Sequence, residues 1–163
     1  MTSQKDSHLE NIRGIRAELL QLINGMDYCL DWKPDADSWS AREVIYHLID
    51  TPCGGMHTLI HGILCGDLAE FDLMPDLNNM SPERLGHDIE RVRQDVGGLL
   101  LALEEAVAAA QEEDFSGKSV LAHLKARGRD EARTAQTLLE GLFARHWREH
   151  LGQLRELRET LGV

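Results

Sequence analysis

Apolar side chains recur at steps of three and four along most of this chain, and this spacing is the feature that most limits its fold. Such a repeat places the apolar residues on one face of an α-helix, because each residue is rotated by about 100° from the one before it. The helical repeat occurs in residues 6–30, in a stretch that begins at Ser40, and in residues 81–110 and 130–161. No stretch shows the alternation typical of a strand. The pattern predicts an all-α protein.

Short signals indicate where these helices begin and break. Ser40 and Glu43 have the spacing of a capping box, in which Ser40 caps the helix and Glu43 reaches back to the cap's own N–H. The segment 52–55, Pro-Cys-Gly-Gly, predicts a kink or a break in the second helix. The Ser-Pro pair at 81–82 is typical of a helix start, and residues 119–127 fit a short additional helix.

Four amphipathic helices of this length predict a four-helix bundle. The 163 residues fit a single domain, residues 1–163, which is large enough to bury a core without disulfides. The connections at about 67–80 and 111–130 are long enough to cross over an end of the bundle.

The composition argues against two classes of partner. Lys and Arg total 17 against 28 Asp and Glu, a net charge of −11, whereas nucleic-acid binding depends on clustered positive charge. No apolar run reaches the roughly 20 residues that a membrane span needs. The polar N-terminus does not resemble a signal peptide, and the three cysteines have no paired spacing. We therefore expect a cytoplasmic protein that binds neither nucleic acid nor a membrane.

Three histidines are predicted to project inward. His146 and His150 lie four residues apart on the apolar stripe of the last helix, and His47 lies on the inward face of the second. A buried polar group without a partner costs about 1–3 kcal/mol. One divalent metal ion would satisfy all three rings and keep open positions for water or substrate. The alternative is that they are core or surface histidines satisfied by hydrogen bonds.

A second pair, His57 and His61, has the same spacing. If the helix continues, it lies about 15–21 Å beyond His47, at 1.5 Å per residue. That distance is too great for the pair to share an ion with His47. We therefore interpret it as a surface or hydrogen-bonded core pair.

Three acids lie close in sequence to the predicted ligands. Glu43 and Asp50 flank His47, and Glu149 directly precedes His150. A carboxylate in this position accepts the second N–H of a ligand histidine or serves as a general base. The alternative is an ordinary solvated charge, with Glu43 acting only as a helix cap.

Two segments resemble the DinB/YfiT-like superfamily. Residues 39–50, Trp-Ser-Ala-Arg-Glu-Val-Ile-Tyr-His-Leu-Ile-Asp, are similar to the opening of its second helix, and residues 146–154, His-Trp-Arg-Glu-His-Leu-Gly-Gln-Leu, to its closing block. The resemblance implies an up-down-down-up four-helix bundle, frequently a homodimer. It also implies a divalent nickel, zinc, iron or manganese ion held by His47, His146 and His150.

The same resemblance leaves several activities open. It implies first a thiol-dependent transferase acting on a small electrophile with a low-molecular-weight thiol, and second a metal-dependent hydrolase. A basic stretch at residues 118–133 is either a site for the carboxylates of a thiol cofactor or a solvated loop. A non-catalytic, stress-associated metal-binding bundle and a metal-free dimer are further alternatives. The segment 52–55 departs from the superfamily pattern and affects the expected pocket shape.

Overall fold

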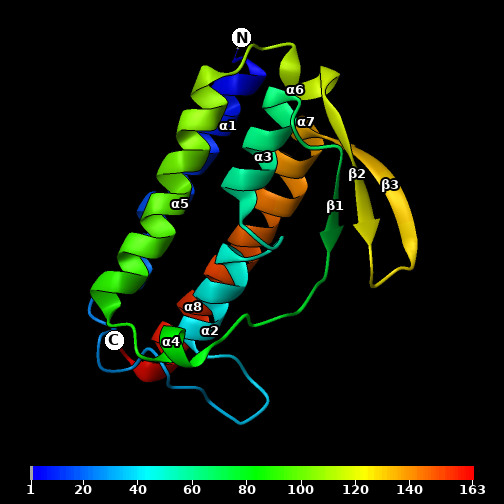
Figure 1. Ribbon diagram of the computed structural model, residues 1–163. Helices are drawn as coiled ribbons and strands as arrows, with labels where there is room; N and C mark the ends of the chain where they lie inside the picture. The colour runs from blue at the N-terminus through cyan, green and yellow to red at the C-terminus, as the bar shows by residue number, and fades with distance from the viewer. Residues whose placement is uncertain (1) are drawn as a thin grey trace.

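The computed structural model describes residues 2–163, and most of them are helical (Figure 1). The N-terminal half contains α1 (Gln4–Leu22), α2 (Ala41–Ile49), α3 (Met56–Cys65) and the short α4 (Pro82–Leu85). The C-terminal half contains α5 (Ile89–Ala109), the short α6 (Asp114–Gly117), α7 (Ala135–Leu138), the π-helical segment η1 (Leu139–Arg145) and α8 (His146–Leu161). The bundle consists of α1, α2 with α3, α5, and the continuous rod of α7, η1 and α8.

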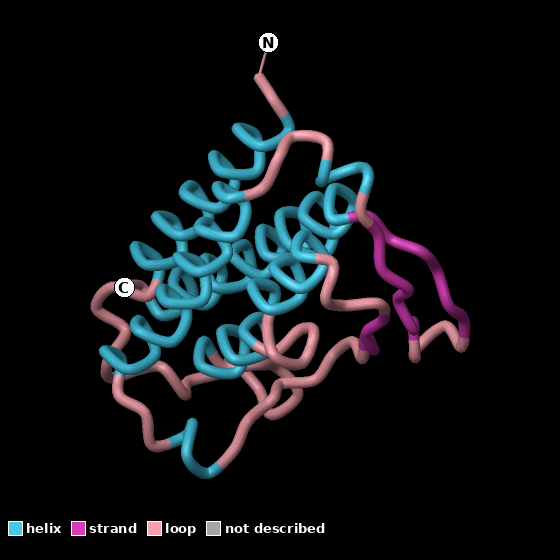
Figure 2. Tube along the Cα trace, turned by 45° about the horizontal axis from the view of Figure 1, so that its top comes forward, coloured by secondary structure: helices cyan, strands magenta, loops and turns pink. Residues whose placement is uncertain are grey.

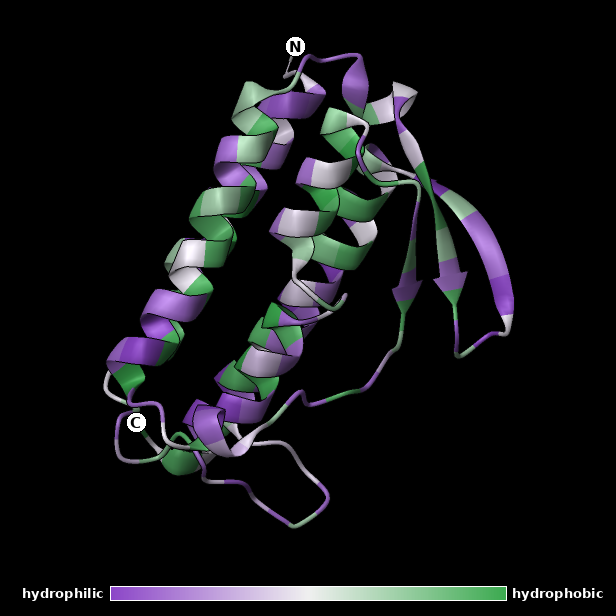
Figure 3. Ribbon diagram, viewed as in Figure 1, coloured by the Kyte–Doolittle hydropathy of each residue, from purple (hydrophilic) through white to green (hydrophobic). Residues whose placement is uncertain are grey.

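The apolar faces of these helices meet in one core (Figure 3). Ile12 and Leu19 of α1, Val96 and Leu100 of α5, and Trp147 of α8 are fully buried in it. α1 packs against α5 and α8, α3 against α5, and α2 against α8. Burying one large apolar side chain contributes about 1.5–3 kcal/mol, so packing rather than helix propensity holds the bundle together.

Two predicted helices have different bounds in the structure. α1 ends at Leu22 rather than near residue 30, and a turn with Gly25 at φ 80° follows. The third predicted helix is divided, because α4 ends at Leu85 and a new side-chain cap from Asp88 opens α5. Ser81 caps a helix as expected, but that helix is the short α4 and not the long α5.

The predicted capping box and the predicted break are both confirmed. Ser40 Oγ accepts a hydrogen bond from the Glu43 N–H at 3.2 Å, and Glu43 Oε1 accepts one from the Ser40 N–H at 3.1 Å. The segment between α2 and α3 contains Gly54 and Gly55 at φ 89° and 91°, a backbone region that favours glycine. α2 and α3 are therefore separate helices that share one position in the bundle.

The chain also contains a three-stranded sheet, so the prediction of an all-α protein is wrong in this region (Figure 2). β1 (Glu70–Leu73) is parallel to β2 (Ser119–Leu124), and β2 is antiparallel to β3 (Arg129–Thr134). β1 belongs to the connection after α3, and the other two strands belong to the connection after α5. The two long connections therefore meet in a sheet at the side of the bundle (Figure 1).

The helix predicted over residues 119–127 is wrong for a physical reason. Val120 and Ala122 are buried and the residues before each are exposed, which is the two-residue period of a strand. The hairpin turns near Gly128 at φ 61°, and β3 occupies the place where the fourth helix was expected to begin. That helix begins at Ala135.

No helix in the described part of the chain, residues 2–163, is long and apolar enough to cross a membrane.

Candidate metal centre

The structure brings the three predicted histidines together. His47 lies in the last turn of α2, His146 is the first residue of α8, and His150 lies one turn further along α8. His146 Nε2 lies 3.2 Å from His47 Nε2 and 3.2 Å from His150 Nε2. One ring nitrogen of each residue lies within 4.8 Å of the other two. We call these residues the histidine cluster.

The outer ring nitrogens determine which way two of the rings face. His47 Nδ1 lies 2.6 Å from the Leu77 carbonyl oxygen, and His150 Nδ1 lies 2.8 Å from Gln153 Oε1. A carbonyl oxygen only accepts, so the proton of His47 resides on Nδ1 and leaves the Nε2 lone pair directed into the cluster. The Gln153 amide oxygen has the same effect on His150, and Gln153 is a partner that the sequence analysis did not identify.

The aromatic ring of Trp39 covers the cluster. Its centroid lies 4.9 Å from that of His47 and 6.3 Å from that of His150, with which it stacks at an interplanar angle of 12°. Trp39 was noted only as part of the similar segment, and nothing in its sequence position indicated this contact. Its ring therefore packs against two of the three histidines.

Burial lowers the pKa of two of the three histidines, His47 and His146. Desolvation lowers the pKa of His47, and the neighbouring His150 ring lowers it further. Desolvation lowers the pKa of His146 to about 4, and the nearby His150 and His47 rings act in the same direction. The Leu142 carbonyl opposes this shift, although His146 Nδ1 has no hydrogen-bond partner that meets the usual geometry among residues 2–163. Neutral imidazole is the form that binds a metal ion.

The donor set fits a divalent metal ion. Two nitrogens bound to one tetrahedral ion at about 2.0–2.1 Å are about 3.3–3.4 Å apart, close to the 3.2 Å found here. Three facing Nε2 atoms cannot satisfy one another, because at least two of them carry lone pairs. A shared cation would accept the nitrogen lone pairs. Among the described residues, the cluster includes no carboxylate that would serve as a fourth ligand.

The three predicted acids lie in different surroundings. Glu43 bonds to Ser40 in the capping box and accepts from Asn78 Nδ2 at 2.9 Å, and Asp50 forms an ion pair with Arg84 at 2.6 Å. Glu149 is exposed and lines a cavity next to the cluster. None of the three joins the histidine cluster, and their catalytic roles stay predictions.

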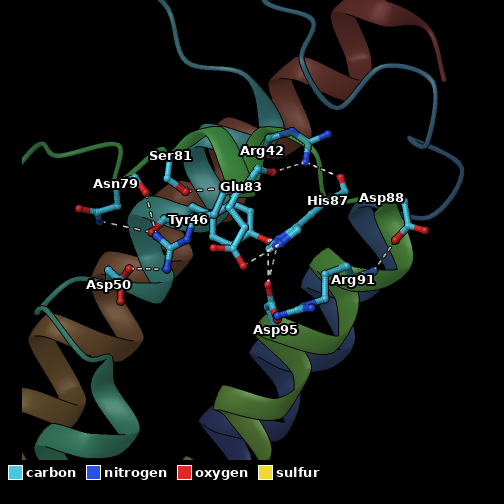
Figure 4. A network of polar contacts seen from close by, with 11 residues as sticks. Arg42, Tyr46, Asp50, Asn79, Ser81, Glu83, His87, Asp88, Arg91 and Asp95 are labelled. Atoms are coloured by element: carbon cyan, nitrogen blue, oxygen red, sulfur yellow. Dashed lines mark hydrogen bonds and ion pairs between the residues drawn. The ribbon is translucent and has the colours of Figure 1, made fainter.

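A polar network behind α2 holds the turn that carries His47 (Figure 4). The Tyr46 hydroxyl donates to Asp95 Oδ2 at 2.8 Å and lies 2.8 Å from His87 Nδ1, and the Arg84 guanidinium stacks 4.6 Å from the Tyr46 ring centroid. Burial and the Asp95 carboxylate raise the pKa of Tyr46, so the phenol stays protonated. Because Tyr46 directly precedes His47, this network connects the end of α2 that carries His47 to α5.

The remaining histidine pair lies outside the cluster. His61 is exposed and near Cys65, and His57 is half-buried with Nδ1 unpaired. They belong to α3, beyond the break that follows α2. The prediction that this pair does not join the site at His47 is confirmed.

By its fold, this protein is a four-helix bundle with a small sheet at its side, and three of its histidines converge. Its fold is similar to that of YfiT from Bacillus subtilis, described as a probable metal-dependent hydrolase with an unusual four-helix bundle topology. The TM-score is 0.72 over 97% of this chain and 87% of that chain, with 18% sequence identity. No family model matches the chain, and no curated protein does. The resemblance to the DinB/YfiT-like superfamily is thus confirmed as a likeness in fold.

Proposed function

We propose that this protein is a divalent-metal-dependent hydrolase with His47, His146 and His150 as its metal ligands. The observation that carries the proposal is the convergence of one ring nitrogen from each of the three histidines, with no carboxylate in the cluster among the described residues and with His146 on the wall of a cavity. Three protein ligands with an open position are typical of catalytic rather than structural sites. The description of YfiT as a probable metal-dependent hydrolase favours hydrolysis over thiol transfer.

The metal ion would supply Lewis acidity that activates water and polarises the bond to be hydrolysed. The chain's own residues orient and protect the site. The Leu77 carbonyl and Gln153 hold the rings of His47 and His150 with their lone pairs inward. Glu149 lines the same cavity as His146, and in this proposal its carboxylate is the general base that accepts a proton from water.

Glu43 and Asp50 have positioning roles in this proposal. Glu43 accepts from the side chain of Asn78, the residue that follows the Leu77 carbonyl bonded to His47. Arg84, which pairs with Asp50, donates to the Asn79 carbonyl at 2.8 Å in the same loop. Both acids therefore brace the loop that orients His47.

Further features belong to the proposal as predictions. They are the up-down-down-up order of the helices, a single domain over residues 1–163, a homodimer, a cytoplasmic location and the choice among nickel, zinc, iron and manganese. Transfer of a low-molecular-weight thiol to an electrophile is the reaction against which hydrolysis is tested. A metal-binding bundle without catalysis would retain the ion and show neither activity.

The test combines metal content with activity. Protein purified without a histidine tag should contain about one divalent ion per chain by elemental mass spectrometry, because one cluster binds one ion. The H146A/H150A double variant should lose the ion, and it should also lose the hydrolysis of activated esters that the metal-loaded protein performs. The matched control is H57A/H61A, which removes a pair of the same spacing outside the cluster and should keep both.

Equal metal content in both double variants would contradict the site, as would no binding of added divalent ions by the natural chain. Metal binding without ester hydrolysis, but with thiol-dependent consumption of an electrophile, would replace hydrolysis by transfer as the function of the same site.

A further inference from the structure

A cavity of about 330 Å³ lies between the sheet and the C-terminal helix. One wall comes from β1, β2 and the hairpin, and the other from α7, η1 and the first turn of α8. His146 and Glu149 belong to this wall, so the cavity adjoins the histidine cluster. Its volume is within the range of pockets that bind small molecules.

Much of the cavity wall is apolar. It includes Phe71 and Leu73 of β1, Leu124 of β2, Leu138 of α7 and Leu142 of η1. These side chains come from both walls, so an apolar group inside the cavity would contact them on two sides. Each CH₂ that such a group buries would therefore strengthen binding.

The charged side chains of the wall are mainly positive, in contrast to the net charge of −11 for the chain. Arg127 of the hairpin, Arg133 of β3 and Arg145 of η1 line the cavity, against the single acid Glu149. A concentration of one sign of charge in a concave, partly apolar site attracts ligands of the opposite charge.

Two of these arginines form no ion pair or side-chain hydrogen bond with an acid within residues 2–163. Arg133 is paired with Glu131, whereas Arg127 and Arg145 donate to no carboxylate or carbonyl within residues 2–163. Arg145 Nη2 would lie 3.1 Å from a Cβ at residue 141, so its guanidinium occupies space that Gly141 leaves free. Both groups therefore retain their donors for a ligand.

We infer that the cavity binds a small amphiphilic anion, a molecule with an apolar body and a carboxylate head, whose head bonds to Arg127 and Arg145. Guanidinium groups suit a carboxylate because both are planar and form two parallel hydrogen bonds. The further step, that such an anion is the substrate and presents its scissile bond to the histidine cluster, rests on the proposed function. The binding itself does not.

Calorimetric titration with octanoate tests the inference. Octanamide has the same body without the charge, and acetate has the head without the body. Octanoate should bind the chelator-treated protein at least tenfold more tightly than either, because both parts of the ligand contribute. Chelation matters because a carboxylate also binds metal ions directly.

The variant R127Q/R145Q should weaken octanoate binding about tenfold or more, since a hydrogen bond between charged groups contributes about 1.5–3 kcal/mol. The matched control is R129Q, an arginine of the same hairpin that pairs with Glu131 at 2.5 Å and does not line the cavity. R129Q should leave the affinity unchanged. Thermal unfolding and metal content of each variant establish that the fold and the histidine cluster are intact.

Equal binding of octanoate and octanamide would overturn the inference, as would equal affinity in R127Q/R145Q and R129Q. Octanoate binding that requires the metal ion and is unchanged in R127Q/R145Q would also overturn the inference. That result would not contradict the proposed hydrolase site. Octanoate binding that depends on the arginines in H146A/H150A, with no metal bound by the natural chain, would support the anion site and reject the hydrolase.

Discussion

Acidification should destabilise the metal-free protein through His146. Burial and two neighbouring imidazoles lower its pKa to about 4 in the folded state, whereas an unfolded histidine has a pKa of about 6.5. Above pH 6.5 both states are neutral at this residue and the free energy of unfolding is unaffected. Between pH 6.5 and about pH 4, the unfolded chain binds a proton at this residue that the folded chain does not bind. The free energy of unfolding therefore falls as the pH is lowered through this range.

The magnitude follows from the two pKa values. At pH 4.5 the unfolded ring is almost fully protonated and the folded ring mostly is not, which costs about 2.5 kcal/mol relative to neutral pH. His146 keeps some solvent exposure, so this figure is an upper limit. A loss of this size is measurable, because domains of this size are stable by about 5–15 kcal/mol.

The assay is urea unfolding in the presence of a chelator at pH 7 and pH 4.5. The natural chain should lose up to about 2.5 kcal/mol more than H146Q, which has no imidazole at this position. H61Q removes an exposed histidine of α3 and should retain the full loss, because His146 is still present. An equal loss in the natural chain and H146Q would refute the reasoning, since it would mean that His146 titrates normally in the folded protein.

Two further predictions concern the residues around the cluster. N78A should lower metal affinity about tenfold, measured by competition with a chromophoric chelator. The reason is that the loop whose Leu77 carbonyl bonds to His47 loses its hydrogen bond to Glu43. An unchanged affinity would show that this loop does not position His47. Y46F should lower the free energy of unfolding, measured with urea at pH 7, by about 1–3 kcal/mol, because Asp95 loses a buried hydrogen-bond donor. A change below about 0.5 kcal/mol would show that water replaces the hydroxyl.

The features predicted from sequence depend on residues close together in the chain. The capping box joins Ser40 to Glu43, and His146 and His150 are four residues apart, so each follows from the geometry of one helical turn. His47 required one further assumption, that the inward faces of two helices meet. Apolar periodicity supports that assumption because each helix must bury its apolar face.

The sheet depends on pairing between distant segments, and local patterns do not contain that information. Glu70 of β1 pairs with Leu121 of β2, and β3 consists largely of charged residues, a composition that does not predict a strand. The cavity lies between this sheet and the C-terminal helix, so it could not be predicted either. Arg127 and Arg145 were therefore recognisable as charges in the sequence, but not as two residues of one wall.

The π-helical segment explains how the histidine cluster meets the cavity. A regular helix places His146 and His150 on the apolar stripe, yet the fully buried positions of α8 are Trp147, Leu151 and Leu154, and both histidines lie at the edge of that stripe. The His146 N–H donates to the carbonyl of Gly141, five residues earlier, which shifts the register of the helix that follows. At the edge of the core, the rings reach His47 on one side and adjoin the cavity on the other. The shifted register therefore lets His146 both contact His47 and line the cavity, which is the arrangement that the proposed hydrolase requires.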